Sequence, residues 1–337
     1  MAASPGRAVG HACGKAILLG EHAVVYGVPA VAVGIDRGAR ATADVTERGP
    51  SRLLVKGWNI TVREDQTDHD LARAFRALLE VAREGEGGRK SAAATGAVAV
   101  EVEAALPPGG GLGCSAAIGV AIARAVSPHA GAEGIQARAM AWERVFHGNP
   151  SGIDAAVAVR GGCVVFRRGE PIEPVRVRGP LQLCIGNTGV ASSTKTMVEG
   201  VARLRERRPA IVEKSFEGIR ALVQNARLAI EAGDRFALGR LMDLNQMLLA
   251  GLFVSTPEIE RMCSLARDAG ALGAKLTGAG GGGCVVALVP SPAVGDAILE
   301  AWRRDGLEGF STQVAPEVAL DTGVDARVRG LETETAP

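Results

Sequence analysis

Residues 97–126 read AVAVEVEAALPPGGGLGCSAAIGVAIARAV and predict a strand, a glycine-rich loop and a helix. Apolar and polar residues alternate from Ala97 to Leu106, as in a half-buried strand, and two prolines end the run. The glycine-rich segment Gly109–Gly113 carries few side chains, and Ser115 opens an apolar run at helical spacing. Backbone N–H groups in such a loop, next to a helix N-terminus, favour an anion. We therefore expect a phosphate-binding loop, with an ordinary tight turn as the alternative.

The loop does not follow the best-known nucleotide-binding pattern. It lacks the Gly-Lys-Ser/Thr ending of a Walker A sequence, because Cys114 and Ser115 follow Gly113. It does match a dinucleotide fingerprint at Gly111-x-Gly113-x-x-Ala116. An oxidoreductase that binds NAD(P)H therefore stays open as an alternative, with Glu133 as the acidic residue about 20 positions further on.

Composition narrows the class of protein. A chain of 337 residues can form two domains, and a net charge of +1 argues against nucleic acid as a partner. The six cysteines form no CxxC pair. The N-terminus lacks the apolar core of a signal peptide, and no apolar run is long enough to cross a membrane. We expect a cytoplasmic protein with free thiols that does not bind a membrane.

The second half of the chain predicts a separate domain, with the boundary near Gly179-Pro180. A strand at 181–185 is followed by a polar loop at 187–196, two long helical stretches to about residue 250 and a helix at 257–269. Strands at 274–276, 285–289 and 310–314 and a helix at 292–304 complete a split βαβ, ferredoxin-like pattern. We therefore expect an α+β protein with domains at 1–180 and 181–325 and a flexible tail at 326–337.

Candidate functional side chains lie in three further blocks. Lys15, Glu21 and His22 are polar residues in the otherwise apolar stretch 14–27, which could equally be a surface turn. Glu143 lies on a predicted helix at 135–146, where a solvated face is the simpler interpretation. In HGNPSGID, residues 147–154, Asn149 or Ser151 can cap a helix, and the helix dipole favours the carboxylate of Asp154 in its first turn.

Retained lysines and a second glycine loop add to this set. The chain uses arginine for nearly all of its positive charge, yet Lys15, Lys195 and Lys275 fall inside or beside the motifs. The second loop, TGAGGGGC, spans residues 277–284. Two glycine loops, a lysine and scattered carboxylates fit phosphoryl transfer better than hydride transfer. Ser115 and Glu143 carry the oxygen donors that Mg²⁺ prefers.

These motifs, taken together, resemble the GHMP kinase superfamily. Its three motifs are matched by GKAILLGEHAVVYG at 14–27, PPGGGLGCSAA at 107–117 and KLTGAGGGGC at 275–284. ERVFHGNPSGID at 143–154 and STKT at 193–196 are similar to the mevalonate kinase family within it. The resemblance implies an N-terminal domain like ribosomal protein S5 domain 2, a C-terminal ferredoxin-like domain and a cleft between them for ATP and substrate.

The resemblance also implies a reaction and residue roles. ATP would phosphorylate the C5 hydroxyl of (R)-mevalonate to 5-phosphomevalonate, with Mg²⁺ as cofactor and a homodimer left open as the assembly. Asp154 would be the catalytic base and Lys15 the lysine that lowers the alcohol pKa. The other implied sets are the Mg²⁺ ligands Ser115 and Glu143, the mevalonate contacts Lys15, Glu21, His22, Asp154 and Thr194, and the ATP contacts Pro108, Gly109, Gly110, Gly111, Leu112, Gly113, Cys114, Ser115 and Gly280.

Two positions depart from the family pattern. Cys114 stands where the family usually has serine, which replaces a hydroxyl by a weakly bonding thiol and predicts sensitivity to thiol reagents. Cys13 stands where proline is usual, which affects the stiffness of the loop more than its chemistry.

Three further alternatives stay open within and beyond this family. A phosphomevalonate kinase should carry more basic residues near the acceptor than HGNPSGID offers. A galactokinase is disfavoured because Ala23-Val24, and not Thr-Asp, follow His22. A catalytically inactive binding protein on the same fold is the third alternative.

Overall fold

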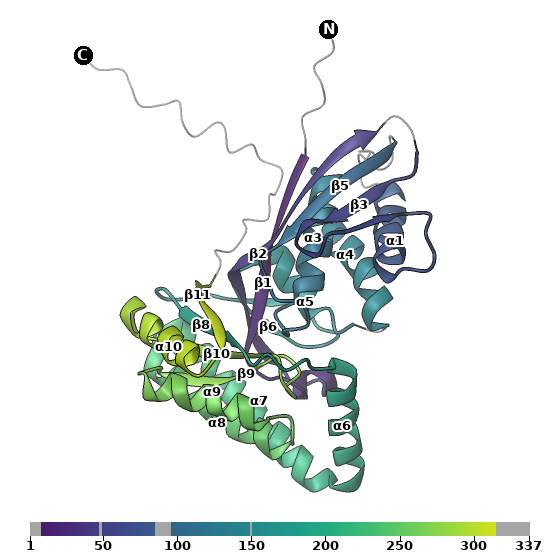
Figure 1. The fold of residues 1–337 in the computed structure, drawn as a ribbon. Coiled ribbons are helices and arrows are strands. Elements are labelled where there is room, and N and C mark those ends of the chain that lie inside the picture. The colour runs from purple at the N-terminus through teal and green to yellow at the C-terminus, as the bar shows by residue number, and fades with distance from the viewer. Residues whose placement is uncertain (1–7, 47–48, 85–95, 149, 315–337) are drawn as a thin grey trace, which may run out of the picture.

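The structure is a computed structural model, and it describes residues 8–46, 49–84, 96–148 and 150–314. The proposed tail at 326–337 and the candidate cap Asn149 lie outside these ranges. Figure 1 shows two parts stacked one above the other, with the strands β1 (Ala8–Leu19) and β2 (Ala30–Thr46) running from the upper part into the lower. This mixed arrangement of helices and sheets is the α+β fold that the sequence predicts.

The first sheet has seven strands in the order β4-β3-β5-β2-β6-β7, with β1 paired to β2 off this path. All pairings are antiparallel except that of β3 with β5. Besides β1 and β2, its members are β3 (Arg52–Val55), β4 (Ile60–Arg63), β5 (Ala97–Ala104), β6 (Cys163–Phe166) and β7 (Glu173–Val175). Two short 3₁₀ helices lie in connections between strands: η1 (Ala23–Tyr26) between β1 and β2, and η2 (Lys56–Trp58) between β3 and β4.

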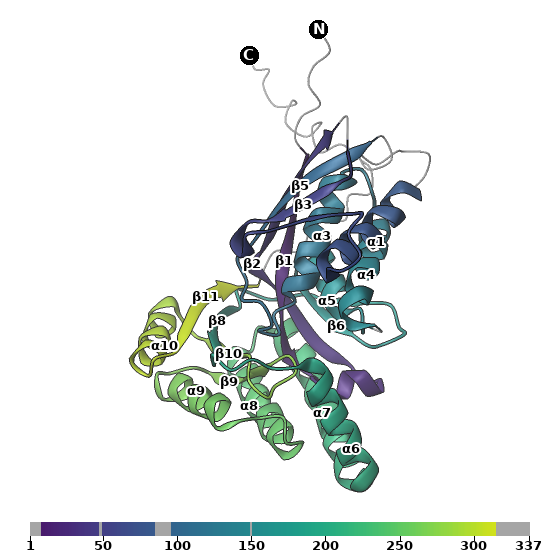
Figure 2. The same ribbon diagram turned by 45° about the vertical axis from the view of Figure 1, so that its right-hand side comes forward.

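Four helices cover one face of this sheet, as Figures 1 and 2 show: α1 (Asp70–Glu84), α3 (Cys114–Val126), α4 (Ala132–His147) and α5 (Ile153–Arg160). The central helix α3 is almost wholly buried, because its alanines and glycine allow close packing on both sides. A Cβ at Gly119 would lie 2.8 Å from the Trp142 ring of α4, so that contact requires glycine. The helix that carries Ser115 therefore has a fixed position in the core.

The second sheet has four strands in the order β11-β8-β10-β9, all antiparallel. Its strands are β8 (Gln182–Asn187), β9 (Gly273–Thr277), β10 (Cys284–Val289) and β11 (Glu308–Gln313). Numbered from the first strand of this half, the order is 4-1-3-2, which is that of a ferredoxin-like sheet. The helices of this half are α6 (Thr194–Arg207), α7 (Pro209–Ala232), α8 (Arg235–Gly251), α9 (Pro257–Asp268) and α10 (Pro292–Arg304).

The helical region before residue 250 differs from the sequence prediction. It holds three helices and not two, because Arg208 leaves the helical conformation and Pro209 begins a new helix at its first position. Proline is well suited to that position and disfavours a helical residue before it. The predicted loop at 187–196 is also shorter, because Ser193 caps α6 and Thr194 is already helical. Among the described residues, no helix is long and apolar enough to cross a membrane.

Candidate active site

Lys15 and Asp154 form a close ion pair between β1 and α5. Lys15 Nζ lies 3.1 Å from Asp154 Oδ1, and the side chains are 5% and 35% exposed. The pairing of β1 with β2 shifts register between Cys13 and Gly14, immediately before this lysine. Asp154 lies in the first turn of α5, as the sequence predicts, although Gly152 is the N-cap and Ser151 Oγ accepts only a 3.5 Å bond from Ile153 N. A nearly buried ammonium thus faces a carboxylate that stays open to solvent.

Ser115 and Glu143 form a second polar pair, between α3 and α4. Ser115 Oγ donates to Glu143 Oε1 at 2.6 Å and accepts from Trp142 Nε1 at 3.1 Å. Burial raises the pKa of the Glu143 carboxyl to about 7; the charge of Asp154 adds to this, while the Ser115 hydrogen bond and the charge of Lys15 oppose it. Glu143 is therefore a buried carboxylate whose charge needs a nearby cation.

The first glycine loop is docked directly on the Lys15–Asp154 pair. The N–H of Lys15 donates to the carbonyl of Leu112 at 2.9 Å. Gly113 has φ +70°, and a Cβ there would lie 3.0 Å from Lys15 Cγ and 3.8 Å from Asp154 Cβ. Leu112 is buried in the core, so only its backbone is available to a ligand. The loop and the two polar pairs therefore converge on one region.

The two glycine loops touch each other across the two halves of the chain. A Cβ at Gly111 would lie 3.3 Å from Gly278 Cα, and one at Gly278 would lie 3.0 Å from Gly111 Cα. Gly280 packs closely against neighbouring backbone, because a Cβ added there would lie 2.1 Å from the Val254 carbonyl oxygen. The Gly280 carbonyl accepts a hydrogen bond from Ser192 Oγ. The second loop therefore closes against the first through bare backbone.

A cavity of about 580 Å³ opens beside these pairs. Glu143, Asp154 and Thr194, three of the predicted site residues, line it. Two cations not among the predicted site residues, Arg168 and Lys195, line it as well. Lys195 is one of the retained lysines noted from sequence, whereas Arg168 belongs to no motif and only follows strand β6 as an exposed cation. Such a residue is recognised only when the fold brings it to the cavity.

Glu21 and His22 lie apart from this cavity. The Glu21 carboxylate is fully buried, pairs with Lys275 Nζ and accepts from Asn245 Nδ2 at 3.2 Å. It therefore has no open side for a substrate, which differs from its predicted role as a mevalonate contact. The His22 ring is also buried, and its Nε2–H donates to the carbonyl of Ala279 at 2.7 Å. Burial lowers the pKa of His22, which favours the neutral ring.

Cys114 also differs from the expectation of a reactive thiol. It is buried, and its Sγ donates only a weak 3.7 Å bond to the Leu106 carbonyl. Burial raises the pKa of this thiol to about 11. Because the thiolate is the reactive form, the folded protein protects this cysteine from thiol reagents.

The donor set at Ser115 and Glu143 fits Mg²⁺ in its chemistry. A hydroxyl and a buried carboxylate are hard oxygen donors, and Mg²⁺ commonly uses one or two carboxylates together with phosphate oxygens and water. No group of three or more His, Cys, Asp or Glu residues that could hold a metal occurs among the described residues. The protein therefore offers the partial set that suits a metal held jointly with nucleotide phosphates.

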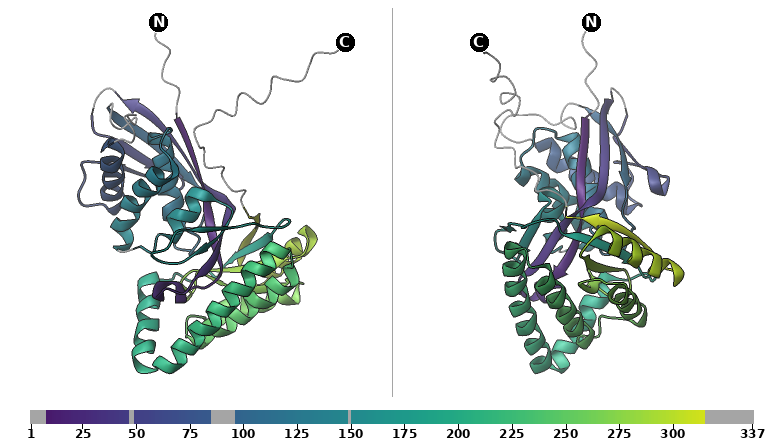
Figure 3. Two further views of the ribbon diagram at one scale, coloured as in Figure 1. Left: turned by 180° about the vertical axis from the view of Figure 1, so that it is seen from behind. Right: turned by 90° about the vertical axis from the view of Figure 1, so that its left-hand side faces the viewer.

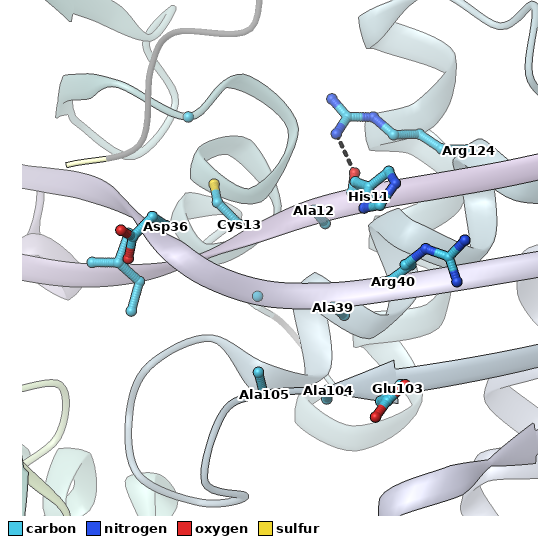
Figure 4. Close-up of a pocket in the computed structure, with 13 residues that line it drawn as sticks. His11, Ala12, Cys13, Asp36, Ala39, Arg40, Glu103, Ala104, Ala105 and Arg124 are labelled. Atoms are coloured by element: carbon cyan, nitrogen blue, oxygen red, sulfur yellow. Dashed lines mark hydrogen bonds between the residues drawn. The ribbon is translucent and has the colours of Figure 1, made fainter. Parts of the chain in front are cut away.

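A second cavity, of about 520 Å³, lies on strands β1, β2 and β5 and contains none of the predicted site residues (Figure 4). Its charged or titratable lining residues include His11, Asp36, Arg40, Glu103 and Arg124. Arg124 donates to the carbonyls of His11 and Val159, and Arg40 stands opposite Glu103 in the β2–β5 register. Its cations already have neighbours within the chain, and we assign it no ligand.

Comparison with known families agrees with this geometry. The GHMP kinases N terminal domain matches residues 71–162, and the GHMP kinases C terminal domain matches residues 226–307. The first match contains the glycine loop with Ser115, Glu143 and Asp154, and the second contains the second glycine loop. Fold and site therefore define a small-molecule kinase of the GHMP class.

Individual relatives narrow this class. A mevalonate kinase from Thermococcus gammatolerans is 37% identical over 84% of this chain and 90% of its own, and one from Aeropyrum pernix is 37% identical over 91% and 95%. The crystal structure of L. major mevalonate kinase in complex with R-mevalonate has a TM-score of 0.77 at 28% identity and covers 93% of this chain and 96% of its own. The chain belongs to the mevalonate kinase family.

Proposed function

We propose that this protein transfers the γ-phosphate of ATP to the C5 hydroxyl of (R)-mevalonate, giving 5-phosphomevalonate and ADP. The observation that carries the proposal is the Lys15–Asp154 pair, 3.1 Å apart and in contact range of the first glycine loop. Phosphoryl transfer requires a cradle for phosphates, a group that orients the acceptor hydroxyl and positive charge nearby. This region brings the three together, and membership of the mevalonate kinase family supports the choice of acceptor.

Asp154 takes the role of the general base in this proposal. Its carboxylate is partly exposed at the cavity wall and accepts the proton of the acceptor hydroxyl as the oxygen attacks the γ-phosphorus. The bond from the γ-phosphorus to the bridging oxygen breaks, and ADP leaves with that oxygen. Lys15 keeps Asp154 oriented and offsets the negative charge that develops on the acceptor oxygen.

Ser115 and Glu143 are the residues that we propose as protein ligands of Mg²⁺. When bound there, the metal neutralises charge on the nucleotide phosphates. Their hydrogen bond at 2.6 Å holds both oxygens in one place, and the Trp142 indole fixes the hydroxyl. Gly109–Gly113, which includes Leu112, and Gly280 supply backbone to the ATP phosphates in this proposal, together with Pro108 before the first loop and Cys114 and Ser115 after it.

The carboxylate of mevalonate requires a cation in the same cavity. Arg168 and Lys195 are the two exposed cations in its wall, and Thr194 adds a hydroxyl beside them. We propose that Arg168 receives the carboxylate, because a guanidinium can bind both of its oxygens at once. His22 is buried and bonded to the second glycine loop outside this cavity, so we propose that it supports the mevalonate site through that loop.

A coupled assay of ADP release tests the function directly. The purified protein is given ATP and Mg²⁺ with either (R)-mevalonate or 5-phosphomevalonate as acceptor. We expect turnover with mevalonate and not with 5-phosphomevalonate. Turnover with only the phosphorylated acceptor would instead assign the protein to the step of a phosphomevalonate kinase, and no turnover with either would favour an inactive binding protein.

We make three further proposals, on the domain division, the cellular location and the oligomeric state of the protein. We propose a division into domains at 1–180 and 181–325, which the change of sheet between β7 and β8 supports. We propose a cytoplasmic location, which the six free cysteines support. We also propose a homodimer, because Phe236, Met247 and Phe253 expose large apolar side chains that a second copy would cover. Analytical ultracentrifugation tests the last of these.

A further inference from the structure

A network of buried contacts joins the end of strand β1 to the second half of the chain. We call it the β1 clasp, formed by Ile17, Glu21 and His22 on one side and Asn245, Lys275, Thr277 and Ala279 on the other. Ile17 N donates to Thr277 Oγ1 at 2.9 Å, and that hydroxyl donates back to the Ile17 carbonyl at 3.2 Å. Figure 3 shows the purple strand β1 running down into the lower part of the molecule, where Figure 1 labels β9.

The centre of the clasp is the ion pair between Lys275 and Glu21, whose side chains have no solvent exposure at all. Lys275 Nζ also donates to the carbonyl of Leu276, and Asn245 Nδ2 donates to the second carboxylate oxygen of Glu21 at 3.2 Å. A charge removed from water in this way is tolerated only with a partner of opposite sign and further hydrogen bonds. Each member of the pair therefore fixes the position of the other.

The clasp adjoins the reacting groups on both of its sides. On the first side, Lys15 lies on the same strand as Ile17, and His22 follows Glu21 directly. On the second side, Lys275 and Thr277 lead into the glycine loop that packs against Gly111. His22 adds its own hydrogen bond to Ala279 within that loop. A displacement at Lys275 would therefore shift one glycine loop against Lys15 and the other loop.

We propose that Lys275 is a positioning residue for the phosphoryl transfer: its buried pair with Glu21 holds the β1 end and the second glycine loop in the register that the reaction needs. Lys275 does not touch substrate in this proposal and acts through Glu21, His22 and the loop backbone. The proposal deepens the proposed kinase function and rests on it.

Three variants separate positioning from stability. Lys275→Met leaves the buried Glu21 carboxylate without its cation, and Glu21→Gln leaves the buried Lys275 ammonium without its anion. Both variants are therefore expected to lower Tm and to lower kcat at least tenfold. The double variant Glu21→Gln, Lys275→Met removes both charges, and its Tm is expected to recover above that of either single variant. Its kcat is expected to stay at least tenfold below wild type, because the bond between Glu21 and Lys275 at the centre of the clasp is gone while the Ile17–Thr277 and His22–Ala279 hydrogen bonds remain. Recovery of both Tm and kcat would overturn the proposal.

Asp243→Asn is the matched control, because Asp243 also links α8 to β9, by accepting from Ala274 N at 3.0 Å, but lies wholly within the second half of the chain. It is expected to keep kcat within twofold of wild type. Asn245→Ala is a milder clasp variant in case the others do not fold; it removes one bond to Glu21 and is expected to lower kcat threefold or more. A wild-type kcat for Asn245→Ala would contradict the proposal.

Hydrogen–deuterium exchange gives a readout that does not depend on turnover. The amides of residues 277–284 are expected to exchange at least tenfold faster in Lys275→Met and in the double variant than in wild type, and Asp243→Asn is expected to leave them unchanged. Unchanged exchange in the clasp variants would refute the role of Lys275. A wild-type protein without mevalonate kinase activity would refute the proposed function and leave this measurement intact.

Discussion

At the scale of single residues, the site depends on two polar pairs that the sequence places far apart. Lys15 and Asp154 are separated by most of the first sheet along the chain, yet their charged atoms are 3.1 Å apart. Ser115 and Glu143 meet across two helices at 2.6 Å. Each pair contributes one carboxylate to the lining of the cavity, Asp154 from the first pair and Glu143 from the second.

Asp154→Asn tests the base at this scale. The amide keeps the size of the side chain but cannot accept a proton, so kcat is expected to fall by roughly 10³-fold. Binding of an ATP analogue, followed by calorimetry, is expected to stay within about threefold of wild type. A variant with near-normal kcat would show that Asp154 is dispensable as a base.

Arg168→Met tests the cation that we assign to the mevalonate carboxylate. Removal of the guanidinium costs a charge-assisted hydrogen bond of about 1.5–3 kcal/mol, so KM for mevalonate is expected to rise roughly tenfold to a hundredfold. KM for ATP is expected to stay unchanged in the same steady-state assays. Arg203→Met, an exposed residue of α6, is the control. An increase in KM for ATP alone would place Arg168 at the nucleotide instead.

At the scale of elements, the periodicity of apolar residues and the positions of proline, glycine and capping residues predict most helices and strands. The helix α10 agrees with the predicted 292–304, because Ser291 and Pro292 mark its start. The split βαβ pattern likewise predicts the second sheet. The short strand β7 and the break at Arg208 are missed, since each depends on packing and on a backbone conformation that no periodicity reveals.

The residues of the site could be predicted from the sequence where they lie in local motifs. The glycine loops and Asp154 lie in recognisable motifs, whereas the role of Glu21 depends on Lys275, 254 residues further along the chain. Burial decides that Glu21 faces the protein interior and not a substrate, and burial is a property of the folded molecule. Arg168 escaped prediction for the same reason.

Gly113→Ala tests the geometry of the first glycine loop. Gly113 has φ +70°, and the new Cβ would lie 3.0 Å from Lys15 Cγ, so the loop or the lysine must move. Backbone strain of this kind costs about 1–3 kcal/mol. We expect kcat/KM for mevalonate to fall at least tenfold and Tm to fall by a few degrees.

Gly306→Ala is the matched control for that strain. Gly306 has φ +78° but nothing within 4 Å of its Cβ, and it lies in the turn after α10. It is expected to lower Tm to a similar degree while kcat/KM stays within about twofold of wild type. Equal losses of activity in both variants would attribute the effect to stability and not to loop geometry.

At the scale of the whole molecule, stability and pH are linked through buried groups where the two halves meet. His22 is buried, and burial together with the positive charge of Lys275 lowers its pKa below the ordinary 6.5. The unfolded chain therefore binds a proton at a higher pH than the folded one. The contribution of His22 to stability is present above about pH 6.5 and is lost as the pH falls below it.

Chemical denaturation between pH 5 and pH 8 checks this sign. The contribution of His22 to the free energy of unfolding is expected to fall by at most about 1.4 kcal/mol per pH unit as the pH decreases below 6.5, whereas Glu143, whose pKa burial raises to about 7, contributes in the opposite direction. His22→Gln removes the titration but can still donate to the Ala279 carbonyl, so the stability of wild type relative to this variant is expected to fall as the pH decreases in this interval. A variant curve parallel to that of wild type would assign the acid sensitivity to other groups.

The contacts of strand β1 also bear on how the protein is made. Ile17, near the end of β1, and Glu21, just after it, leave the ribosome early, but their partners at Asn245, Lys275 and Thr277 lie 224–260 positions later. At about 5–20 residues per second, roughly 10–50 s pass before the buried polar groups at that end of the strand can bind their partners. A fragment that starts at residue 181 would bury the Lys275 ammonium with no carboxylate from Glu21 to meet it. We therefore expect the second half to be unstable when it is synthesised alone, and to recover when residues 1–180 are supplied as a separate polypeptide.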